Sequence, residues 1–126
     1  MNARLRINHF RRQGRRASLA IICLFATVPL NGHAILKECS PAPHSIVSGP
    51  DINIRLRFNS RIDAAHSSLH LTIGSQSRDV KATAQAEPDT LLGQAKAVTA
   101  GEYRIQWQVL AIDGHITRGE VPFTVR

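Results

Sequence analysis

The most regular feature of the chain is the alternation of apolar and polar residues. Apolar side chains occupy every second position in four stretches, at residues 52–58, 69–73, 103–109 and 121–125. Alternation with period two predicts strands that turn one face to a core and the other to water, as in antiparallel sheets. Two weaker strands are predicted at 78–84 and 90–97, and no stretch has the spacing of an amphipathic helix.

The segments between these strands are rich in turn-forming residues. Examples are "SPAPHSIVSGPD" before residue 52 and "GSQS" after residue 73. Six or seven short strands in about 94 residues predict an all-β fold, a small Ig-like β-sandwich of about seven strands. Trp107 is in phase with Ile105 and Val109, so it is interpreted as a core residue.

The first 32 residues have the composition of an export signal. Six arginines and no acidic residue accompany the apolar run "ASLAIICLFATVPL" at 17–30. This run is shorter than the roughly 20 residues that span a bilayer. The sequence therefore predicts a cleaved signal peptide at 1–32 and a mature domain at 33–126, with an uncleaved N-terminal anchor as the alternative.

The charge and the cysteines are divided between leader and body. The formal net charge is +7, but from His33 onward ten Lys and Arg face nine Asp and Glu. A body near +1 does not favour nucleic acid as a partner. Cys23 lies in the leader, so Cys39 has no internal disulfide partner in the mature domain. We interpret Cys39 as a small, buried apolar residue.

Candidate chemistry lies at the two ends of the predicted domain. If cleavage follows Gly32, His33 offers its α-amine and its imidazole to one ion. In a sandwich, Asp113 and His115 can approach that terminus, and Gly114 allows the backbone between them to turn. A set of one amine, two imidazoles and a carboxylate suits Cu(II). An Asp-Gly-His sequence by itself is more often only a turn.

Three stretches together resemble the CopC family of periplasmic copper-resistance proteins: "HAILKECSPAP", "IRLRFNSRID" and "GEYRIQWQVLAIDGHITRGEVPFTV". The resemblance implies a secreted Greek-key β-sandwich that binds one Cu(II) per mature chain near its N-terminus. It places the metal ligands at His33, Asp113 and His115. It also implies a monomer that serves as a periplasmic copper carrier or buffer in copper resistance or homeostasis. A separate CopD-like inner-membrane protein is the expected partner, because no membrane span follows the sandwich.

Two departures from the family pattern change this expectation. Ser60 stands where many relatives have a glutamate, so we do not expect a carboxylate ligand there. Met1 is the single methionine, which argues against a thioether site for Cu(I). The remaining histidines of the body are not expected to be ligands: His44 is interpreted as a turn residue, and His66 and His70 lie in a strand pattern that turns His70 to solvent.

Other functions stay open at this point. A secreted copper monooxygenase that holds its metal in a histidine brace is one alternative, and an Ig-like interaction domain without metal is another. Few aromatic residues and the anionic Asp113 argue against the enzyme. The cleavage position is also open: a cut after Ala34 matches signal peptidase preference better but removes His33.

Overall fold

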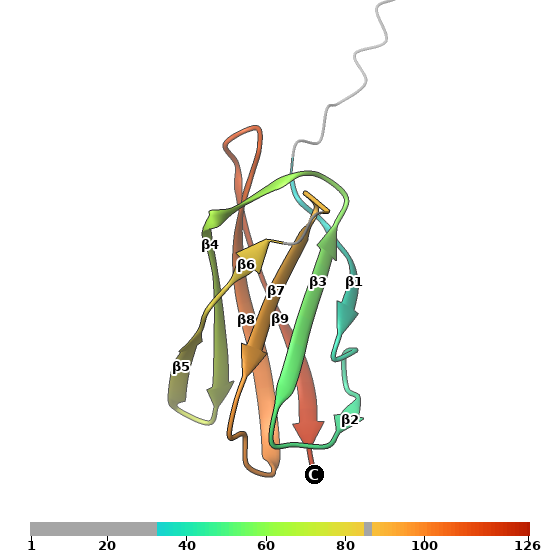
Figure 1. Cartoon of the computed structure of the whole chain (residues 1–126), viewed down its shortest axis with the longest axis vertical. Helices are drawn as coiled ribbons and strands as arrows, with labels where there is room; N and C mark the ends of the chain where they lie inside the picture. Colours follow the sequence, from blue (N-terminus) through green and yellow to red (C-terminus); the bar gives the residue numbers. More distant parts are fainter. Residues whose placement is uncertain (1–32, 85–86) are drawn as a thin grey trace, which may run out of the picture.

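The computed structural model describes residues 33–84 and 87–126, and the predicted signal peptide at 1–32 lies outside this part. The described residues form nine strands and no helix (Figure 1). Seven strands have five or more residues and two have only two residues. They are β1 (Leu36–Ser40), β2 (Ile46–Val47), β3 (Ile52–Phe58), β4 (Ile62–Ile73), β5 (Gln76–Val80), β6 (Thr83–Ala84), β7 (Thr90–Ala95), β8 (Gly101–Ala111) and β9 (Ile116–Val125).

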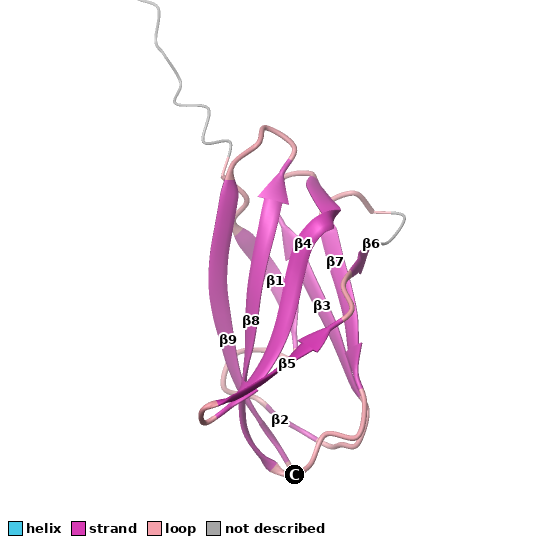
Figure 2. Cartoon of the chain, turned by 90° about the vertical axis from the view of Figure 1, so that its left-hand side faces the viewer, coloured by secondary structure: helices cyan, strands magenta, loops and turns pink. Residues whose placement is uncertain are grey.

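The strands form two sheets that pack face to face (Figure 2). One sheet has the order β1-β3-β7-β6 and the other the order β2-β9-β8-β4-β5. All pairings are antiparallel except that of β2 with β9. The predicted Ig-like β-sandwich is confirmed. None of the described residues belongs to a helix that could cross a membrane.

The inner faces of both sheets supply the core, as the alternation predicts. In β3 the apolar residues Ile52, Ile54, Leu56 and Phe58 are buried, and the polar residues between them face outward. Trp107 of β8 is 7% exposed, and its ring meets Phe58 edge to face with centroids 5.1 Å apart. This geometry is favourable for aromatic pairs, and the contact joins the two sheets.

Several boundaries differ from the sequence-based prediction. The strand predicted at 69–73 begins at Ile62, because a bulge between Asp63 and Ser68 interrupts the alternation that the prediction relies on. The strand predicted at 78–84 is divided between β5 and β6, which belong to different sheets. The short β2 lies in the segment expected to be a turn-rich connection, where pairing with β9 overrides the local composition.

Candidate metal site

The loop between β8 and β9 carries Asp113, Gly114 and His115. The hairpin pairing ends at Leu110 and Ile116, and the chain reverses through a turn in which the Gly114 N–H donates to the Ala111 carbonyl at 2.9 Å. Gly114 has a φ of 90°, a region that favours glycine. The predicted role of Gly114 in the turn is confirmed. Figures 1 and 2 show this loop at the end of the sandwich where the chain enters β1.

Asp113 is bound to His115 within the loop. Its Oδ1 accepts the His115 backbone N–H at 3.1 Å, and its Oδ2 lies 3.0 Å from Nδ1 of the His115 ring. The backbone hydrogen bond, then the His115 side chain and the nearby His33, hold the pKa of Asp113 below its ordinary value. The carboxylate therefore stays ionised at neutral pH, with its charge directed toward the two imidazoles.

The start of the described chain reaches the same loop. The His33 and His115 rings meet at an interplanar angle of 67°, with centroids 4.8 Å apart. The next residues fix this position, because Ala34 is fully buried and the Ile35 N–H donates to Oδ1 of Asn59 at 2.7 Å. Asn59 in turn donates its backbone N–H to the Ile35 carbonyl at 2.9 Å. The fold thus brings together two histidines that are 82 positions apart in the sequence (115 − 33).

Asn59 is a positioning residue that the sequence analysis missed. It follows Phe58 at the end of β3, and its side chain and backbone both bind Ile35. An asparagine after a strand is usual in a turn, so its type gives no local signal of this role. Only the pairing of β1 with β3 shows it.

The three predicted ligands lie together but do not form a complete coordination sphere. Among residues 33–84 and 87–126, no three His, Cys, Asp or Glu side chains are arranged as donors to one ion. Asp113 and Nδ1 of His115 contact each other, which leaves Nε2 of His115 and the His33 ring as available nitrogens. The α-amine of His33 is an amide in the full chain, since Gly32 precedes it. Nitrogen donors next to an ionised carboxylate fit Cu(II).

Two other residues singled out in the sequence are Ser60, which stands where many relatives have a glutamate, and Cys39. Ser60 lies in the loop after β3, and its buried Oγ has no hydrogen-bond partner among the described atoms. Cys39 of β1 is half-buried against the core, and burial raises the pKa of its thiol. The protonated, apolar form of Cys39 is therefore favoured, which agrees with its interpretation as a small packing residue.

The remaining histidines occupy other places. His44 lies in a turn with a φ of 60°, and its backbone N–H donates to the Pro122 carbonyl, so its interpretation as a turn residue is confirmed. His66 sits in the β4 bulge with Nδ1 at 2.8 Å from Asp63. His70 is partly exposed on the outer face of β4, where its Nδ1 lies 2.7 Å from Asp79 of β5.

The described residues form a small Ig-like sandwich, and the comparisons with known proteins agree with this fold. A family model described as the CopC domain matches residues 36–126. Copper resistance protein C of Xanthomonas campestris pv. juglandis is 29% identical over 119 residues, which cover 87% of this chain and 88% of that protein. Protein YobA of Escherichia coli (strain K12) is 26% identical over 117 residues, covering 88% and 94%.

Solved structures give the same result. CopC from Methylosinus trichosporium OB3b superposes with a TM-score of 0.66 at 32% identity, covering 74% of this chain and 93% of that one. PcoC from Escherichia coli, described as a methionine-rich copper resistance protein, has a TM-score of 0.66 at 27% identity, covering 75% and 99%. The chain belongs to the CopC family. Unlike a methionine-rich member, it has the single methionine Met1.

Proposed function

We propose that this protein is a periplasmic Cu(II) carrier or buffer that works in copper resistance or homeostasis and is not an enzyme. One ion is held by His33, as the first residue of the mature protein, together with Asp113 and His115. Membership of a family with copper-resistance relatives supports copper as the cargo. The observation that carries the assignment of the site is the meeting of the His33 and His115 rings at 4.8 Å.

The set of donor atoms explains why we propose Cu(II) and not Cu(I) as the bound ion. Two imidazoles, an amine and a carboxylate are harder ligands than the thioethers and thiolates that select Cu(I). The half-buried Cys39 has a raised thiol pKa, which makes it a poor thiolate ligand. We therefore expect tight binding of Cu(II) and weak binding of Cu(I).

Asp113 supports storage in preference to oxygen chemistry. Its carboxylate is held in the charged form beside both histidines. An anionic ligand there would occupy a coordination position that a copper monooxygenase must leave open for oxygen. Handover of the ion to a separate CopD-like membrane protein, by a monomeric carrier, is the remaining part of the proposal.

The decisive experiment concerns the N-terminus. The exported protein is purified without a tag, its first residue is determined by mass spectrometry, and Cu(II) affinity is measured by competition with a chelator. The same measurement is made on a form with one methionine added before His33. Because the extension turns the α-amine into an amide, Cu(II) affinity should fall by at least about tenfold, and the fold should be unchanged.

Two results would contradict this site. A mature protein that begins at Ile35 would lack His33 altogether. Equal affinity of the native and extended forms would mean that the amine is not a ligand, and the site would then reduce to side chains around Asp113 and His115.

A further inference from the structure

The bond between Asp113 and Gly114 can undergo a reaction of its own, apart from any binding of metal. Asp113 is the single aspartate of the chain that is followed by glycine. A glycine nitrogen has no side chain beside it, so it can approach the carboxyl carbon of the preceding aspartate and form a cyclic imide, a succinimide. The other aspartates are followed by residues that have side chains and lie in strands: Ile52 in β3, Ala64 in β4, Val80 in β5 and Thr90 in β7.

The tip of the β8–β9 hairpin is open to solvent. Residues 112–116 are all exposed. A Cβ at Gly114 would meet no atom within 4 Å, and the φ of 90° lies in a region that glycine reaches easily. Loops with few buried contacts open locally at a low cost in free energy. The water that the reaction needs therefore reaches Asp113 in the folded protein.

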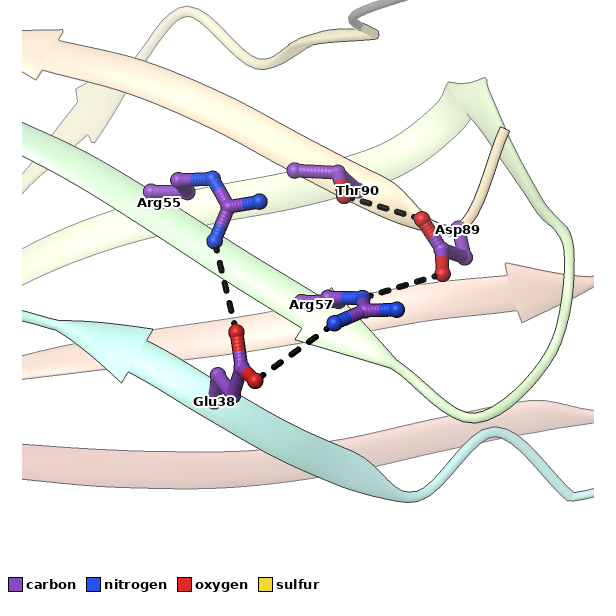
Figure 3. A network of polar contacts seen from close by, with 5 residues as sticks. All are labelled: Glu38, Arg55, Arg57, Asp89 and Thr90. Atoms are coloured by element: carbon purple, nitrogen blue, oxygen red, sulfur yellow. Dashed lines mark hydrogen bonds and ion pairs between the residues drawn. The ribbon is translucent and has the colours of Figure 1, made fainter. Parts of the chain in front are cut away.

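Asp89 is in the opposite situation. Figure 3 shows its carboxylate between two donors, Nε of Arg57 at 3.3 Å and Oγ1 of Thr90 at 3.0 Å. Thr90, which follows it, is β-branched and fully buried, and its N–H donates to the Glu87 carbonyl at 3.2 Å. Because the Thr90 nitrogen is shielded and paired, we expect no imide at Asp89.

Hydrogen bonds turn the two reacting groups of the hairpin tip away from each other. The Gly114 N–H donates to the Ala111 carbonyl at 2.9 Å. The Asp113 carboxylate accepts the His115 backbone N–H at 3.1 Å and lies 3.0 Å from Nδ1 of the same residue. A carboxylate only accepts, so Nδ1 is the donor in this contact. The His33 ring packs against the His115 ring, and the imidazole thus keeps the carboxylate away from the Gly114 nitrogen.

We propose that Asp113 is converted slowly to isoaspartate through a succinimide with Gly114, and that the His115 side chain slows this conversion. The Gly114 nitrogen bonds to Cγ of Asp113, and one carboxyl oxygen leaves as water with the amide proton and a carboxyl proton. Water then adds to the imide and breaks the bond between this nitrogen and the main-chain carbonyl carbon of Asp113. The chain now continues through Cβ and Cγ. Because the water released equals the water consumed, the mass is unchanged and no oxidant or cofactor is needed.

The isomerisation needs no bound metal, so it goes beyond the proposed function. It does have a consequence for copper, and this consequence alone rests on the proposed function. Isoaspartate adds a methylene to the main chain and leaves the free carboxylate directly on Cα. A carboxylate moved in this way no longer lies beside Nδ1 of His115. If Asp113 and His115 bind one Cu(II), the isoaspartyl protein binds it less tightly.

The test follows the ageing of the mature protein by peptide mapping. The wild type and variants are incubated at neutral pH in EDTA, so that loss of a copper ligand has no effect on the result. Trypsin then releases residues 105–118, in which Asp113 is the single aspartate. The isoaspartyl peptide has the same mass, separates from the normal peptide by chromatography and is identified by its fragmentation.

His66→Ala is the matched control for His115→Ala. Asp63 accepts the His66 backbone N–H at 3.3 Å and lies 2.8 Å from Nδ1 of His66, so the two pairs have the same contacts. Asp63 is followed by Ala64 and not by glycine. Residues 62–78 form its tryptic peptide, with Asp63 as the single aspartate.

We expect isoaspartate at position 113 in the wild type and none at position 63 in any folded form. His115→Ala should form it at position 113 at least about threefold faster, because a hydrogen bond to a charged group is lost. His115→Asn places an amide N–H near the position of Nδ1 and should return the rate close to that of the wild type. Circular dichroism checks that all forms are folded.

Each part of the proposal has its own contrary result. Absence of isoaspartate at position 113 in the folded wild type, over a time in which the urea-unfolded chain forms it, would overturn the modification site. A rate for His115→Ala no higher than that of the wild type, or equal rates for the Ala and Asn variants, would overturn the role of the His115 side chain. The isoaspartyl protein is finally separated and titrated with Cu(II) against a chelator. An affinity equal to that of the unmodified protein would contradict Asp113 as a copper ligand and leave the modification site in place.

Discussion

The two halves of the β8–β9 hairpin show how differently one continuous motif can be used. In the paired strands, Gly119 lies opposite Trp107, and the indole ring occupies the space where a side chain would be. At the tip, Gly114 has open space around it, and its importance lies in its positive φ. The strand half is fixed by packing density, whereas the tip is fixed by backbone conformation and hydrogen bonds. We therefore expect substitutions in the strands to change stability and substitutions at the tip to change copper binding.

The largest stability effect is expected from Gly119→Ala. A Cβ at this position would overlap Cζ2 of Trp107 and lie 2.7 Å from Cε2, so the buried ring or the strand must shift. Overpacking of this kind costs about 3 kcal/mol, near the upper end of its usual range. Urea unfolding followed by Trp107 fluorescence measures the loss, because this is the single tryptophan. Unchanged stability would mean that the core near Trp107 is looser than the structure indicates.

The second effect is a loss of Cu(II) affinity caused by a substitution at the tip of the β8–β9 hairpin. His115→Ala removes one imidazole from an exposed loop, so Cu(II) affinity should fall by about 30- to 100-fold while stability stays close to that of the wild type. His70→Ala is the matched control: it removes a histidine that also pairs with an aspartate, on the outer face of β4. Competition titrations compare the two variants. If both lower the affinity equally, the site has been assigned to the wrong residues.

A third effect is the pH dependence of copper binding. Protons compete with Cu(II) for imidazole and amine nitrogens, which ordinarily titrate at about 6.5 and about 7.7 to 8.0. The pKa of Asp113 is lowered by the His115 backbone N–H, so its carboxylate loses its charge only below its ordinary range. Cu(II) affinity should therefore fall at least about tenfold from pH 8 to pH 6, and Asp113 should contribute none of this change. Titrations that give the same affinity at both pH values would exclude these nitrogens as ligands.

A smaller loss of stability than that of Gly119→Ala is expected from Gly114→Ala. A Cβ there meets no atom within 4 Å, so the cost is the backbone strain of an alanine at a φ of 90°, about 1 kcal/mol. Because the turn sets the directions of Asp113 and His115, Cu(II) affinity should fall as well. Gly119→Ala should lower the stability more than Gly114→Ala does and leave the Cu(II) affinity of the folded protein nearly unchanged. Identical profiles for the two variants would remove the distinction between strand and tip.

Local pattern predicted the strands well where alternation is unbroken. Every second residue is buried along β3, from Tyr103 to Ala111 in β8 and from Val121 to Val125 in β9, and burial of alternate apolar side chains is what the pattern encodes. The prediction failed at β4, where the residues between Asp63 and Ser68 bulge away from β8. It also failed at β2, whose two residues gain their strand geometry only from β9.

The sequence by itself determined the fold class, the place of Trp107 in the core and the turn at Gly114, because each depends on residues within a few positions of one another. Tertiary structure decided the rest of the site. The meeting of His33 with His115 needs Asn59 to hold Ile35, which lies 24 positions away in the sequence. Contacts between residues far apart in the chain come from the packing of the two sheets, and no local pattern of apolar and polar residues records them.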